Sequence, residues 1–98
     1  MNDQHRNIIL ITLVCYGPDA WVTLNDLSEA LFNAHLPGYP GYPPRDVCDE
    51  WAREAAESLR RDGLLEAHPD TCNELRLTRL GSKQAAEALI RTLLMRRG

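Results

Sequence analysis

The spacing of apolar and polar positions along the chain predicts four helices. The first is almost entirely apolar, which is typical of a largely buried helix, and the second has a narrow apolar stripe at positions i, i+3 and i+7. The third has one apolar arc with charged residues opposite it, whereas apolar residues cover well over half of the fourth. The predicted ranges are residues 4–16, 24–34, 45–62 and 79–96.

Local signals at the predicted helix ends support these ranges. Thr23 and Asp26 have the spacing of a capping box before the second helix. Pro44 suits the first turn of the third helix, and Gly63 suits the position just beyond its end. Thr78 is placed to cap the fourth helix through its hydroxyl group.

Short apolar segments between the third and fourth helices predict a β-hairpin over residues 64–77. Residues 20–22 are a candidate first strand beside this hairpin. Residues 36–44 hold four prolines and two glycines, a composition that excludes helix and sheet and predicts a loop. We therefore expect one domain over residues 1–98, mainly α-helical with a small β-hairpin.

Charge is distributed unevenly along the chain. Residues 1–75 contain five basic and thirteen acidic side chains, a net charge of −8, and residues 76–98 contain six basic and one acidic, a net of +5. The sum is the overall charge of −3. A basic end on an acidic body predicts an anion-binding edge or packing between copies, and solvated helix ends are an equally ordinary explanation.

Several classes of protein are disfavoured by the residues present. The three cysteines lie far apart without a Cys-x-x-Cys pair, which favours a reducing, cytoplasmic location. The apolar run at residues 8–15 is too short to span a membrane. Because the sequence has no zinc-ligand spacing, phosphate-binding glycine loop or catalytic constellation, we expect no metal, no cofactor and no enzymatic activity.

Two short motifs carry a resemblance to a known family. The segments Leu59-Arg-Arg-Asp-Gly-Leu-Leu-Glu66 and Leu77-Thr-Arg-Leu-Gly81 are similar to bacterial winged-helix regulators of the PadR and MarR-like kinds. The chain also resembles small winged-helix proteins encoded by Mu-like prophages. The resemblance implies a winged helix-turn-helix fold and transcriptional regulation through DNA, with the third helix in the major groove and the hairpin near the backbone.

The resemblance and the positions of the basic residues together predict a set of DNA contacts on the second and third helices and beside the hairpin. The candidates are Asn25, Arg45, Arg53, Arg60, Arg76 and Arg79. The charge of the third helix opposes this prediction, because its polar face carries four acids against two arginines.

The same acidic face predicts an alternative function, a winged-helix module that binds a basic protein without binding DNA. Tyrosines on a proline-stiffened loop would serve as interface anchors, or they would fold back over the end of the second helix. The candidate interaction residues are Tyr39, Tyr42, Asp46, Asp49 and Glu50.

The fourth helix has more apolar surface than one buried face requires. We therefore expect a homodimer through this helix and the first helix, unless the first helix covers the surplus within one chain. The candidate dimer residues are Leu89, Ile90, Leu93 and Leu94.

Overall fold

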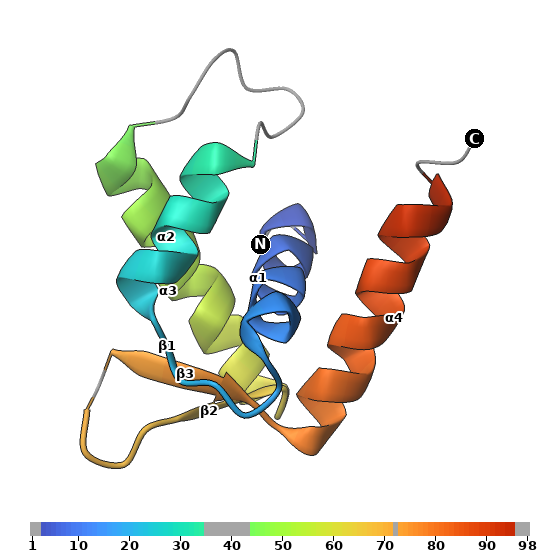
Figure 1. The fold of residues 1–98 in the computed structure, drawn as a ribbon. Coiled ribbons are helices and arrows are strands. Elements are labelled where there is room, and N and C mark those ends of the chain that lie inside the picture. Colours follow the sequence, from blue (N-terminus) through green and yellow to red (C-terminus); the bar gives the residue numbers. More distant parts are fainter. Residues whose placement is uncertain (1–2, 35–43, 72, 96–98) are drawn as a thin grey trace.

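The structure is a computed structural model that describes residues 3–34, 44–71 and 73–95 (Figure 1). The described chain is mainly helical and carries one small antiparallel sheet, as the hydrophobic pattern predicts. Of the predicted loop 36–44, only Pro44 lies within the described residues. The elements in order are α1 (Asp3–Tyr16), β1 (Val22–Thr23), α2 (Leu24–Asn33), α3 (Arg45–Arg61), β2 (Leu65–Ala67), β3 (Glu74–Leu77) and α4 (Arg79–Met95).

The predicted hairpin is part of a three-stranded sheet with the order β1-β3-β2. Leu65 pairs with Leu77 across the hairpin, and Val22 of β1 pairs with Leu75 on the other side of β3. The predicted first strand at residues 20–22 is therefore present but begins at Val22 and ends at Thr23. The shift arises because pairing with β3, and not the local apolar pattern, sets which residues of β1 are in register.

The start of α2 is tied to the turn between β2 and β3. The hydroxyl of Thr23 accepts a hydrogen bond from the Asp26 amide at 3.1 Å, and the Asp26 carboxylate accepts one from the Thr23 amide at 3.4 Å. This pair is the predicted capping box. The amide of Leu24 donates to the carbonyl oxygen of Asn73 at 2.9 Å, so the first turn of α2 and the β2–β3 turn are adjacent.

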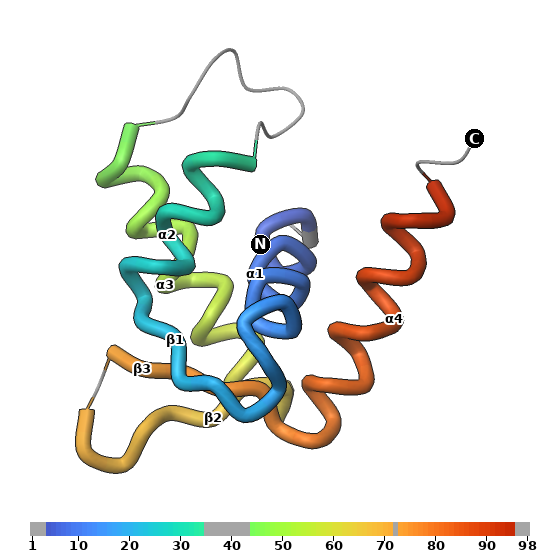
Figure 2. The backbone as a smooth tube through the Cα atoms, in the orientation of Figure 1, coloured from blue at the N-terminus to red at the C-terminus, as the bar shows by residue number. Residues whose placement is uncertain are grey.

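The hydrophobic core lies between α1, α2, α3 and the inner face of the sheet (Figures 1 and 2). Ile9, Leu13, Leu31 and Leu59 are among the fully buried side chains. The helical repeat predicts that α3 buries an arc of Val47, Cys48, Trp51, Ala52, Ala55 and Leu59. Val47 and Trp51, at one edge of this arc, are only half-buried, and Ala56, just beyond the other edge, is buried. The fully or nearly buried residues of α3 are Cys48, Ala52, Ala55, Ala56 and Leu59.

A compact junction connects the end of α3 to the start of α4. Gly63 has a positive φ of 79°, which ends α3 in the conformation that glycine adopts readily. The Thr78 hydroxyl donates to the Gly63 carbonyl oxygen at 2.7 Å and accepts from the Gly81 amide at 3.0 Å. The predicted cap at Thr78 is thus confirmed, and the same side chain joins the two motifs that carry the family resemblance.

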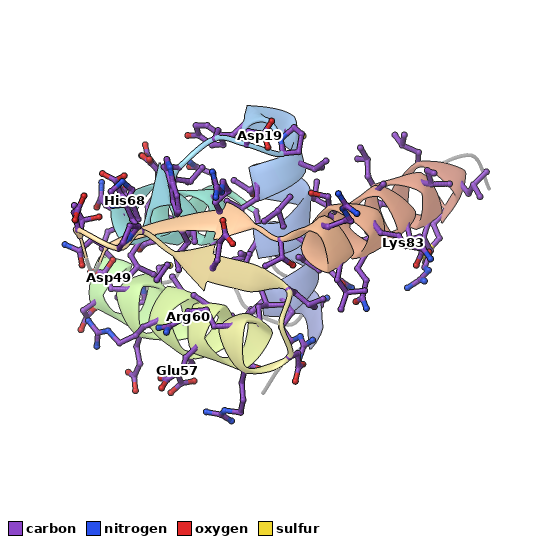
Figure 3. The ribbon with its side chains drawn as sticks, turned by 90° about the horizontal axis from the view of Figure 1, so that it is seen from below. Asp19, Asp49, Glu57, Arg60, His68 and Lys83 are labelled. Atoms are coloured by element: carbon purple, nitrogen blue, oxygen red, sulfur yellow. The ribbon has the colours of Figure 1, made fainter. Side chains whose placement is uncertain are left out.

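Helix α4 packs against α1 and leans away from the rest of the molecule toward its C-terminal end (Figures 1 and 3). Gly81, Ala85 and Ala88 form its buried side. Of the helices that the structure describes, none combines the length and apolar character required to cross a membrane.

Candidate nucleic-acid interface

A surface hollow of about 320 Å³ lies where α3, the start of α2 and the β2–β3 turn meet. Its walls combine basic, acidic, amide and apolar side chains from three elements that are distant in sequence. The lining residues are Leu24, Arg53, Ala56, Glu57, Arg60, Asn73 and Leu75. Because it is shallow and mixed in character, the hollow is suited to contact with a surface more than to enclosing a small molecule.

Two arginines of α3 dominate the charge of this hollow. Arg53 and Arg60 are seven residues apart, so their side chains leave the same side of the helix two turns apart. Both are exposed, and Glu57 lies between them on the same wall. Figure 3 shows Arg60 and Glu57 on the outer surface of α3, far from Lys83 on α4. The three side chains have a net charge of +1, which favours an anionic ligand.

The other walls of the hollow are fixed by backbone contacts. The hydrogen bond from the Leu24 amide to the Asn73 carbonyl oxygen holds the β2–β3 turn beside the N-terminus of α2. The amide groups at this end of α2 carry the partial positive charge of a helix N-terminus. The sequence does not predict Leu24, Glu57 or Asn73 as site residues, since nothing in the local pattern links the turn to α2.

Two further predicted DNA contacts touch each other and not the hollow. The Arg45 guanidinium donates to the Asn25 side-chain oxygen at 3.3 Å and lies 5.6 Å from the centre of the Phe32 ring. Both Arg45 and Asn25 are exposed. They therefore form a second polar contact between α2 and α3.

Arg76 is engaged within the protein. Its Nε donates to Glu66 Oε1 at 2.7 Å, and its guanidinium lies 4.3 Å from the centre of the Trp21 ring. Glu66 and Arg76 are direct cross-strand partners, so the pairing offsets the charge that DNA binding would require. His68 also contacts Trp21, with the two ring centres 4.6 Å apart. Arg79 is exposed at the start of α4.

The residues predicted for protein interaction differ in their exposure and in their contacts within the protein. Asp46 and Glu50 are exposed on α3. Asp49 is also exposed but accepts a hydrogen bond of 2.5 Å from Ser28, a side chain of α2 that is only 1 % exposed. Asp49 therefore has a structural contact that the helical pattern did not predict. Tyr39 and Tyr42 lie outside the described residues.

Two titratable groups of the described chain are shifted by burial. His5 stacks on Trp51 with ring centres 4.6 Å apart, and burial lowers the pKa of its imidazole although the nearby Glu54 carboxylate acts to raise it. Burial likewise raises the pKa of the Cys48 thiol, despite the opposing effect of Arg45. Cys48 thus stays a protonated thiol in the core. Within the described residues, no group of three potential ligand side chains is arranged to hold a metal ion.

Comparison of this chain with protein-family models, with curated proteins and with solved structures finds no match.

Proposed function

We propose that this chain is a winged helix-turn-helix protein that regulates transcription by binding double-stranded DNA. The element order and the strand order β1-β3-β2 agree with this architecture, with α2 and α3 as the helix-turn-helix and β2–β3 as the wing. The observation that carries the proposal is that Arg53 and Arg60 of α3 line one hollow together with Asn73 of the wing.

In this proposal α3 lies in the major groove. Arg53 and Arg60 are separated by about 10 Å along the helix axis, a spacing that lets them meet two different base pairs or phosphates. An arginine can form two parallel hydrogen bonds with a guanine edge or a phosphate. The side chain of Asn73 would contact the phosphate backbone and so fix the orientation of α3.

The acidic residues of α3 limit the affinity. Asp46 and Glu50 are exposed on the same helix and repel phosphates, and the charge of Arg76 is offset by Glu66. With the two arginines of the hollow as the phosphate contacts, affinity should fall about 12-fold between 50 and 200 mM salt, compared with at least about a thousandfold for proteins that make six or more. The proposed binding is therefore weak on random DNA and depends on base contacts for specificity.

The test is a titration of a labelled random duplex followed by fluorescence anisotropy at low salt and again with added salt. Arg53→Glu should abolish measurable binding or weaken it at least about tenfold and lower the salt slope. Lys83→Glu is the matched control, since it makes the same charge change on an exposed position of α4.

Two outcomes would overturn the proposal: no binding at low salt, or equal losses in the two variants. The latter would indicate a general effect of net charge with no site on α3. In either case the alternative function, a module that binds a basic protein through exposed Asp46 and Glu50, becomes the better account. A basic peptide in the same assay, with Glu50→Gln as its variant, tests that function directly.

A further inference from the structure

The second half of α4 exposes several large apolar side chains. Ile90, Leu93 and Leu94 are 57 %, 53 % and 60 % exposed, and Met95 is 77 % exposed. Leu89, the fourth predicted dimer residue, is half-buried. Exposed apolar side chains gathered on one element of a small protein mark an interaction surface more often than isolated ones do. Helix α1 therefore leaves much of the apolar surface of α4 uncovered.

The neighbouring helix adds a second apolar surface. A hollow of about 370 Å³ on α1 is lined by Ile11, Thr12, Cys15 and Tyr16, and Tyr16 is 57 % exposed. Because α1 and α4 are in contact, the two surfaces belong to adjacent helices. Each of the two helices thus exposes apolar side chains that an opposing apolar surface would bury.

We propose that α1 and α4 form the interface of a symmetric homodimer, with the α4 helices of the two copies packed antiparallel. In a two-fold interface, each residue i that contacts residue j of the partner copy is matched by the reverse contact. This condition can be met here, because each copy carries both α1 and α4 in the same surface. A second copy would cover both apolar surfaces with the same two surfaces of its own.

The charges of α4 agree with this arrangement. Glu87 and Arg91 are one helical turn apart along one flank of the apolar surface, next to Ile90 and Leu94. An antiparallel pair centred near residue 89 brings Glu87 of each copy beside the arginine at position 91 of the other. These two reciprocal ion pairs select the antiparallel register, because a parallel pair would place like charges together.

The size of the surface also fits a dimer. Helices α1 and α4 are about 21 and 25 Å long and about 10 Å wide, which gives an outline of roughly 450 Å² per copy. The accessible area is larger than this outline because the side chains corrugate it. Stable interfaces bury about 800 Å² per partner, and weak ones bury less than about 600 Å². The proposed dimer lies near this boundary, so we expect micromolar affinity.

The first test measures molar mass by sedimentation or light scattering over a range of micromolar concentrations, without DNA. The wild-type chain should dimerise, and Ile90→Glu should raise the dimer Kd at least about tenfold. Asn33→Glu is the matched control, because it adds the same charge to an exposed polar position of α2, outside the proposed interface. Circular dichroism checks that each variant remains folded.

A charge exchange tests the antiparallel register. Glu87→Arg alone should raise the dimer Kd several-fold, and combining it with Arg91→Glu should restore dimerisation. A wild-type chain that is monomeric throughout, or an Ile90→Glu chain that dimerises like wild type, would overturn the dimer. Failure of the exchange to restore it would overturn the register.

Alkylation of Cys15 tests the part of the interface on α1. Cys15 is exposed and Cys48 is buried, so in a Cys72→Ser background the fast-reacting thiol is Cys15. Its alkylation should slow as the protein concentration rises, and should not slow in Ile90→Glu. Equal rates in monomer and dimer would exclude α1 from the interface.

The proposed dimer has one consequence that rests on the DNA-binding function. Two copies related by a two-fold axis would present two α3 helices and read a site with inverted repeats. Since the molar-mass and alkylation tests contain no DNA, their failure would leave the α3 titration unaffected, and loss of DNA binding would leave the dimer unaffected.

Discussion

Gly81 of α4 lies directly against the backbone of Leu64, so that a β-carbon at position 81 would be 1.9 Å from the Leu64 carbonyl oxygen. The same carbonyl accepts a hydrogen bond from the Thr78 amide at 3.1 Å. The close approach explains why a glycine follows the threonine by three residues, since any larger residue would displace α4 from the turn that follows α3.

Gly81→Ala should destabilise the protein by about 2 kcal/mol or more, because neither backbone segment can move without losing the Thr78 contacts. Gly63→Ala is a useful comparison: nothing lies within 4 Å of an added β-carbon there, and only the positive φ of 79° opposes it. That change should cost about 1 kcal/mol. Urea unfolding measures both values, and equal losses would contradict the steric explanation.

The hydrogen bond from Ser28 to Asp49 should contribute to the packing of α2 on α3. Ser28→Ala removes it and should cost about 1 kcal/mol. Asp49→Ala should cost at least as much, because it leaves the buried Ser28 hydroxyl without this partner. The double variant should lose less than the sum of the two single changes when unfolding is measured by urea. Additive losses would show that the two side chains do not interact.

Stability should depend on pH through His5. Burial lowers the pKa of its imidazole below the ordinary value of 6.5, so the unfolded chain binds the proton more readily than the folded one. The free energy of unfolding should therefore fall as the pH drops below 6.5, and His5 should contribute no slope well above it.

His5→Phe keeps an aromatic ring beside Trp51 but cannot titrate. The difference in unfolding free energy between wild type and this variant, measured by urea at a series of pH values from about 5 to 8, should change only on the acidic side. A difference that is constant with pH would refute the assignment.

Arg76 and Arg53 should affect different properties. Arg76→Gln removes the contacts with Glu66 and Trp21, which are only partly buried, and should cost about 1 kcal/mol of stability with little loss of duplex affinity. Arg53→Gln should do the reverse, since Arg53 is exposed beside the hollow. Urea unfolding and duplex anisotropy on the same two proteins separate the roles. The reverse result, with affinity lost only in Arg76→Gln, would move the proposed site to the sheet.

The helices could be predicted from sequence because their signals are local. The capping box of Thr23 and Asp26 and the glycine at position 63 each act within a few residues, and both are present in the structure. The short strand β1 was less predictable. Its two residues are defined by pairing with Leu75 and Glu74, which lie about fifty positions away in the chain.

The candidate site was predictable only in part. The positions of Arg53 and Arg60 on one side of α3 follow from the helical repeat alone. Their neighbour Asn73 could not be chosen, because it reaches the site through a backbone hydrogen bond with Leu24, and such bonds leave no mark on residue type.

The sequence by itself determined the helices, their ends and the apolar surplus of α4, since these depend on periodicity and on contacts within a few residues. The tertiary structure decided which charged side chains are paired within the protein and which are left exposed to bind a ligand. It paired Arg76 with Glu66 across the sheet and Asp49 with Ser28 across two helices, and it left Arg53 and Arg60 exposed beside the hollow. The physical reason is that charges are neutralised by whatever the fold brings within a few ångströms, and such neighbours are distant in the chain.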